Sequence, residues 1–137
     1  MELIKKHILV VDDDPVLRTL FQVLLENYGY TSQTAENGSE AVTKLAQAPF
    51  DAVLLDYLMP GITGLTVLRH IQQRYPSIPV VMITGHAEGQ VAARAFAAGA
   101  RACLYKPFDC AEFEEVLKCT VGTAPFRAVV SGHVASR

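Results

Sequence analysis

The sequence has no hydrophobic run long enough to cross a bilayer. Its longest apolar segments are HILVV, AVLL and VVMI, which have the length of single strands, whereas a membrane-spanning helix needs about 20 residues. The first residues, MELIKKHILVVDDD, do not resemble a secretory signal, because the apolar run after the two lysines is short and ends in three aspartates. These absences predict a cytoplasmic protein that makes no contact with the membrane.

The sequence also has few cysteines and a small net charge. The cysteines, Cys103, Cys110 and Cys119, form neither a CxxC pair nor a metal-binding spacing with histidine, which favours free thiols in a reducing compartment. The formal net charge is −2, with 12 basic and 14 acidic residues. This near balance argues against a strongly basic surface, and we therefore predict no direct binding of nucleic acid.

The composition is typical of one globular domain. The chain has 137 residues, of which 50% are hydrophobic and 19% charged, and it contains no internal repeat or low-complexity tract. All 14 acidic residues fall within residues 1–120, whereas residues 121–137 carry two arginines and no acid. The chain is therefore expected to consist of a folded unit of about 120 residues followed by a short segment of different composition.

Strand and helix signals alternate along the folded unit. Short aliphatic runs bounded by turn residues predict strands, and apolar residues at helical spacing predict the helices between them. The alternation predicts an α/β fold, with a doubly wound parallel sheet covered by helices on both faces. The predicted strands are 8–11, 31–35, 52–55, 80–83 and 102–104, and the predicted helices are 15–28, 39–47, 65–75, 90–98 and a last one within 108–119.

Polar side chains follow these strands at the points where they end. Asp12 and Asp13 follow the first strand, Asp56 the third, Thr84 the fourth and Lys106 the fifth. Because the carboxyl ends of parallel strands lie at one edge of a sheet, these side chains are expected to converge. Three carboxylates and one ammonium leave a negative excess that a divalent cation would neutralise, and oxygen ligands suit Mg²⁺ better than zinc.

The motifs at the strand ends resemble those of the receiver (response-regulator) domain of two-component signalling. They are VVDDDP at 10–15, LLDYLMPGITG at 54–64, VVMITGHA at 80–87 and YKPF at 105–108, and the resemblance covers about residues 5–120. It implies a flavodoxin-like five-stranded sheet in the order 2-1-3-4-5. It also implies that residues 1–120 form the receiver domain, and that residues 121–137 are a tail or the start of a linker.

The resemblance also implies a role for each residue at the strand ends. Asp56 would accept a phosphoryl group from a sensor histidine kinase or a phosphotransfer protein, as in a phosphorelay. Asp12, Asp13 and Asp56 would bind Mg²⁺, or Mn²⁺ as an alternative, together with the backbone carbonyl of Leu58. Such a domain is a signalling switch that catalyses only its own phosphotransfer and dephosphorylation, so it is not an enzyme in the usual sense.

Lys106 and Thr84 complete the expected site. By resemblance, Lys106 would pair with a phosphoryl oxygen as a point charge, and the Thr84 hydroxyl would donate to another oxygen. A cis peptide is expected between Lys106 and Pro107. His86 lies near Thr84, where the family tunes dephosphorylation, and use of its ring as a general base is a minor hypothesis.

Two other features of the motifs carry alternatives. Asp14 is more simply explained as the N-cap of the helix that starts at Pro15 than as a further metal ligand. Cys103 stands where many receivers have the aromatic residue that reports phosphorylation, so that part of the switch is in doubt. Tyr105 lies on the same side of the strand as Cys103, and it is a candidate substitute.

The weakly charged stretch 88–105 suits packing against a partner, including a homodimer through this surface. The motifs most resemble receivers of transcription regulators, which makes transcriptional regulation the expected process. Two rival functions are a magnesium-dependent phosphohydrolase and an interaction module that is never phosphorylated. The absence of an Asp-x-Asp pair at Asp56 and of a cap insertion argues against the first, and the intact set of polar residues argues against the second.

Overall fold

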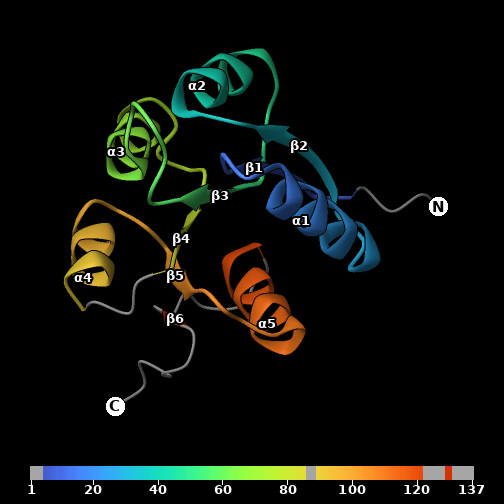
Figure 1. Cartoon of the computed structure of the whole chain (residues 1–137). Coiled ribbons are helices and arrows are strands. Elements are labelled where there is room, and N and C mark those ends of the chain that lie inside the picture. Colours follow the sequence, from blue (N-terminus) through green and yellow to red (C-terminus); the bar gives the residue numbers. More distant parts are fainter. Residues whose placement is uncertain (1–4, 86–88, 122–128, 131–137) are drawn as a thin grey trace.

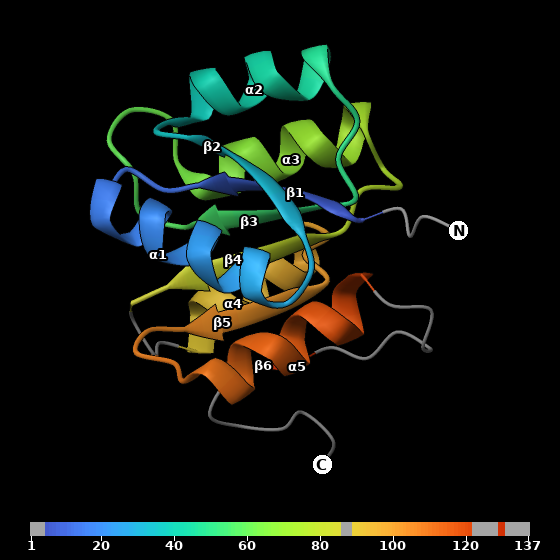
Figure 2. The same ribbon diagram turned by 90° about the vertical axis from the view of Figure 1, so that its right-hand side faces the viewer.

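A computed structural model describes residues 5–85, 89–121 and 129–130 of the chain. Its five main strands pair in parallel in the order β2-β1-β3-β4-β5, which confirms the predicted sheet (Figure 1). Their arrowheads point to the same side of the molecule (Figure 2). The strands are β1 (His7–Val11), β2 (Thr31–Ala35), β3 (Ala52–Asp56), β4 (Val80–Thr84) and β5 (Ala102–Tyr105).

Five helices cover the two faces of the sheet, as predicted. Helices α1 and α5 lie on one face, and α2, α3 and α4 lie on the other (Figure 1). The side chains of each layer pack against the sheet in a separate core cluster. Among the described residues, none of the helices is both long enough and apolar enough to cross a membrane. The helices are α1 (Pro15–Asn27), α2 (Gly38–Gln47), α3 (Gly64–Arg74), α4 (Gly89–Ala97) and α5 (Cys110–Val121).

The central strands are buried on both faces because each face has its own helical layer. In β1, Ile8 and Val10 face α1 and α5, whereas Leu9 and Val11 face the opposite layer. Alternate residues of an extended strand point to opposite faces, so a strand covered on both sides must be apolar throughout. This is why the continuous aliphatic runs identified the strands so closely.

A further short strand lies beyond the predicted five. β6 (Val129–Val130) pairs in parallel with β5, with Ala102 opposite Val129 and Cys103 opposite Val130. Residues 121–137 are predicted to be a tail or the start of a linker; Val121 is the last residue of α5, and Val129 and Val130 join the sheet edge. Within the described residues the sheet therefore has six strands, of which the predicted five form the body.

An aromatic cluster holds the segment after β5 against two helices. Phe21 of α1 and Phe108 stack with ring centroids 5.8 Å apart, and Phe113 of α5 lies 5.6 Å from Phe21 and 5.7 Å from Phe108. Phe21 and Phe113 are completely or almost completely buried. Aromatic pairs at such distances add to the stabilisation from buried area. The cluster fixes the segment at Phe108, two residues after Lys106.

Candidate functional site

The turn after β1 is held by local hydrogen bonds. The Asp12 backbone N–H donates to the Ala35 carbonyl at 3.1 Å, and the Asp14 N–H donates to Asp12 Oδ1 at 2.9 Å. Asp14 Oδ1 accepts a hydrogen bond from the Val16 N–H, and Pro15 is the first residue of α1. The prediction that Asp14 caps this helix is confirmed, and the turn leaves the side chains of Asp12 and Asp13 at the strand end.

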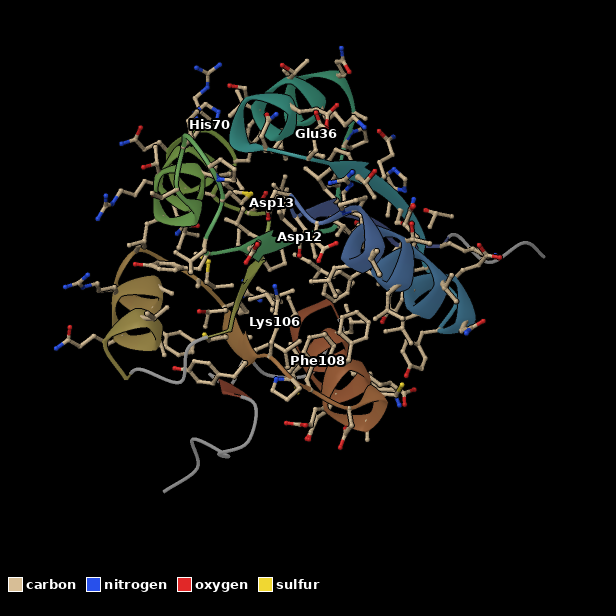
Figure 3. All side chains as sticks on the ribbon, viewed as in Figure 1. Asp12, Asp13, Glu36, His70, Lys106 and Phe108 are labelled. Carbon is tan, nitrogen blue, oxygen red and sulfur yellow. The ribbon has the colours of Figure 1, made fainter. Side chains whose placement is uncertain are left out.

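Three carboxylates converge at the ends of β1 and β3. Asp12, Asp13 and Asp56 each offer an oxygen, and these oxygens lie within 4.8 Å of one another. Asp12 and Asp56 are only 1% and 5% exposed, whereas Asp13 is exposed. Figure 3 shows Asp12 and Asp13 together near the centre of the view, whereas His70 and Glu36 lie toward the periphery. The structure therefore brings together the three acids that the sequence analysis selected.

Lys106 faces two of these acids from the end of β5. Its Nζ lies 3.7 Å from Asp56 Oδ1 and 3.8 Å from Asp12 Oδ2. The Lys106 N–H donates to the Thr84 carbonyl at 2.8 Å, which ties the two strand ends together. The peptide between Lys106 and Pro107 is cis, as predicted. Thr84 is fully buried at the end of β4, so the predicted site residues share one edge of the sheet.

Burial and mutual repulsion raise the pKa values of the two buried acids. The pKa of Asp56 is raised to about 6, mainly by burial and then by the charge of Asp12. Lys106 and the backbone N–H of Leu58 act in the opposite direction, but they do not compensate. The pKa of Asp12 is also raised, again mainly by burial. The site thus carries more negative charge than its own cation offsets.

The donor set fits a hard divalent cation. Asp12 Oδ2 is buried and accepts no hydrogen bond among the described residues, and the Lys106 ammonium, 3.8 Å away, is its ion-pair partner, so this carboxylate oxygen still has room for a ligand bond to a cation. The three carboxylates are oxygen ligands, as Mg²⁺ and Mn²⁺ prefer, and no cysteine or histidine in the part of the chain that the structure describes belongs to the cluster. The backbone carbonyl of Leu58 remains a predicted ligand.

Gly64 determines how closely α3 approaches the end of β3. Its N–H donates to the Tyr57 carbonyl at 3.0 Å, and a Cβ atom at this position would lie 2.4 Å from the backbone oxygen of Asp56. A side chain larger than hydrogen therefore cannot be placed here without displacing Asp56. Gly64 is the last residue of the motif LLDYLMPGITG, but the motif gives it no role of its own, because the distance between two elements is not encoded in a local pattern.

Arg18 is a second residue that the sequence analysis did not select. Its Nη1 donates to the backbone carbonyl of Asp12 at 2.7 Å, and its side chain is half-buried. Its position, four residues after the N-cap Asp14, is the sequence feature that could have indicated this contact. A side chain in the first turn of a helix can reach back over the N-terminal end of that helix. The contact joins α1 to the acidic turn.

The prediction that Cys103 and Tyr105 lie on the same side of their strand is confirmed. Cys103 is fully buried, its burial raises the pKa of the thiol to about 11, and Tyr105 packs against the same core cluster. Burial also raises the pKa of Tyr105, and the N–H of Ala92 in α4 partly opposes this by hydrogen bonding to the phenolic oxygen. Tyr105 therefore links β5 to α4. His86 lies outside the described residues.

Comparison with known proteins finds one family over most of the chain. Residues 8–118 match the family model described as the response regulator receiver domain. The chain is 42% identical over 100 residues to the DNA-binding transcriptional regulator NtrC of Salmonella typhimurium, covering 73% of this chain and 21% of that protein. It is 37% identical over 113 residues to the response regulator protein PilR of Pseudomonas aeruginosa, covering 82% of this chain and 25% of that protein.

Solved structures show the same fold. The receiver domain of NtrX from Brucella abortus is 32% identical with a TM-score of 0.81, and the match covers 85% of this chain and 99% of that one. The chemotaxis protein CheY4 of Vibrio cholerae is 28% identical with a TM-score of 0.81, over 85% and 99% of the two chains. The chain thus spans a whole receiver structure, but only about a fifth to a quarter of the length of NtrC and PilR.

Proposed function

This chain belongs to the response regulator receiver domain family, and from that premise we propose that it is a phosphorylation switch with Asp56 as the phosphoacceptor. The observation that carries the proposal is the position of Asp56 at one sheet edge. Its carboxylate lies with those of Asp12 and Asp13, and it is 3.7 Å from the Lys106 ammonium. The phosphodonor would be a phosphohistidine of a sensor histidine kinase or of a phosphotransfer protein.

In the proposed reaction, a carboxylate oxygen of Asp56 attacks phosphorus. The new P–O bond forms as the P–N bond of the phosphohistidine breaks, and the leaving imidazole takes a proton from solvent. The attacking carboxylate must be ionised. The raised pKa of Asp56, about 6, leaves it largely ionised above pH 7. The product is a mixed anhydride on a buried strand end.

The other groups would position the phosphoryl group and offset its charge. Lys106 would contact one phosphoryl oxygen, and the Thr84 hydroxyl would donate to another. Asp12, Asp13, Asp56 and the carbonyl of Leu58 would hold Mg²⁺, or Mn²⁺ in its place, and a bound divalent ion supplies charge neutralisation at the phosphoryl oxygens. The buried Oδ2 of Asp12, which accepts no hydrogen bond among the described residues, supports this assignment.

Phosphorylation would then shift the balance between two arrangements of the surface near α4 and β5. A phosphoryl group adds about −1.5 to −2 charge at neutral pH, which attracts Lys106 and Thr84 toward Asp56. Tyr105 lies opposite Thr84 in the β4–β5 pairing and hydrogen-bonds to α4. It therefore offers a route for that shift, in a chain where Cys103 replaces the usual aromatic residue. We place the switched surface at 88–105, with a homodimer as one partner.

The wider role is inferred from the relatives. NtrC of Salmonella typhimurium is a DNA-binding transcriptional regulator, and this chain matches about a fifth of it. We propose that the chain acts as a cytoplasmic receiver module in transcriptional regulation, without direct nucleic-acid binding, and that its only turnover is its own phosphotransfer and dephosphorylation. Residues 1–120 would form the receiver, and residues 121–137 a tail or linker.

Incubation with phosphoramidate and Mg²⁺, followed by intact-mass measurement, tests the proposal. The wild-type chain should gain one phosphoryl group, and Asp56→Asn and samples with excess EDTA should gain none. Glu26→Gln removes an exposed acid on α1 and serves as the matched control. A phosphoryl group that persists in Asp56→Asn would contradict the assignment, as would a wild-type chain that is never modified.

A further inference from the structure

The side chain of Arg18, on α1, hydrogen-bonds to the main chain of the turn after β1. Its Nη1 hydrogen-bonds at 2.7 Å to the main-chain carbonyl of Asp12 rather than to a carboxylate. That carbonyl belongs to the peptide group between Asp12 and Asp13. The hydrogen bond therefore restrains the orientation of the peptide group that joins Asp12 to Asp13, two of the three acids of the site.

In the turn after β1, the oxygen of the Asp12–Asp13 peptide has its hydrogen bond from the Arg18 side chain. The Asp12 N–H is fixed by Ala35, Asp12 Oδ1 is fixed by the Asp14 N–H, and the Asp14 carbonyl accepts from the Arg18 N–H at 3.0 Å. These contacts hold both sides of the Asp12–Asp13 peptide, and the Arg18 side chain holds its oxygen. A rotation of that peptide would move the Asp13 side chain relative to Asp12.

Resting on the proposed function, we propose that Arg18 is a positioning residue for the cation site. It fixes the Asp12–Asp13 peptide so that both carboxylates face the ion together with Asp56. A guanidinium suits this task because its charge strengthens the hydrogen bond to the carbonyl.

Arg18 would orient two ligands of the ion and would not bind the ion itself, so its loss should weaken Mg²⁺ binding and not abolish it. Groups that orient metal ligands typically change metal affinity by about 10–100-fold when they are removed. We expect the dissociation constant for Mg²⁺ to rise about tenfold in Arg18→Gln and by less in Arg18→Lys, which keeps the charge and one donor. The phosphorylation rate at saturating Mg²⁺ should stay within about twofold of wild type, because Asp56, Thr84 and Lys106 remain in place.

Titration of the ¹⁵N-labelled chain with MgCl₂, followed by NMR, measures this affinity directly and does not depend on phosphotransfer. The control is Arg69→Gln, which removes the same charge from an exposed position on α3. The amide signals of Asp13 and Asp14 should shift in metal-free Arg18→Gln and not in Arg69→Gln. A cooperative urea-unfolding transition in EDTA shows that a variant is folded. If Arg18→Gln does not fold, the Mg²⁺ affinity of Arg18→Lys is compared with that of the wild type instead.

The outcomes separate this inference from the proposed function. A Mg²⁺ affinity in Arg18→Gln within twofold of wild type, or a loss no larger than in Arg69→Gln, would overturn the positioning role. A loss of phosphorylation rate that saturating Mg²⁺ does not restore would also overturn it. Normal Mg²⁺ binding by a wild-type chain that is never phosphorylated on Asp56 would instead refute the proposed function, and the Arg18 variants would still test the cation site.

Discussion

Replacing Asp56 by asparagine is expected to stabilise the metal-free protein at neutral and alkaline pH. The side chain is buried, and its pKa is raised from 3.8 to about 6, because burial and the charge of Asp12 disfavour the ionised form. Asparagine has nearly the same shape but cannot ionise. The substitution therefore removes an unfavourable charge from the native state and leaves the packing of β3 in place.

The magnitude follows from the difference in pKa between the folded and unfolded chains. A gap of about 2 pKa units corresponds to about 3 kcal/mol of unfolding free energy above both pKa values. The sign is set by the raised pKa: the native protein keeps this stability below about pH 4 and loses it as the pH rises through about 6. The attraction to Lys106 is already contained in the folded pKa, so it is not subtracted again.

Urea unfolding in EDTA at several pH values measures the effect. Asp56→Asn should exceed wild type by about 2–3 kcal/mol near pH 8 and by less than about 1 kcal/mol near pH 4. Glu26→Gln, an exposed control, should differ from wild type by less than about 0.5 kcal/mol at both pH values. An equal gain at both pH values would place its cause outside ionisation, and no gain near pH 8 would refute the raised pKa of Asp56.

Three further substitutions test the structure around the site by urea unfolding. Gly64→Ala should cost about 3 kcal/mol, because its Cβ would lie 2.4 Å from the Asp56 oxygen, and a neutral result would mean that α3 stands further from β3. Asp14→Ala should cost about 1 kcal/mol through the lost helix cap, whereas no loss would show that the cap contributes nothing. Cys103→Tyr should cost about 1–3 kcal/mol, because Cys103 is fully buried; unchanged stability would show that the position accepts the usual aromatic residue.

The strands and the polar residues at their ends could be predicted from the sequence for a physical reason. A strand buried on both faces must be apolar throughout, so β1, β3 and β4 stand out and the first polar residue marks their ends. Parallel pairing then places those ends along one edge. The meeting of Asp12, Asp13 and Asp56 follows from these two facts alone.

Features that depend on distances between elements could not be predicted in this way. Arg18 reaches the Asp12 carbonyl only because α1 leaves the turn at a particular angle, and the need for glycine at position 64 depends on the separation of α3 and β3. β6 has only two residues, which is too short a run for a local pattern to identify as a strand, and its pairing with β5 is a relation between two elements. Periodicity is a property of single elements and does not report such relations.

The central claim, that Asp56 accepts a phosphoryl group, is tested most directly by locating the modified residue. After reaction with phosphoramidate and Mg²⁺, borohydride reduces an aspartyl phosphate to homoserine, and peptide mass spectrometry identifies its position. The account predicts homoserine at position 56, formed only when Mg²⁺ is present. Homoserine at position 12 or 13, a phosphoryl group on His70, or no modified residue at all would contradict it.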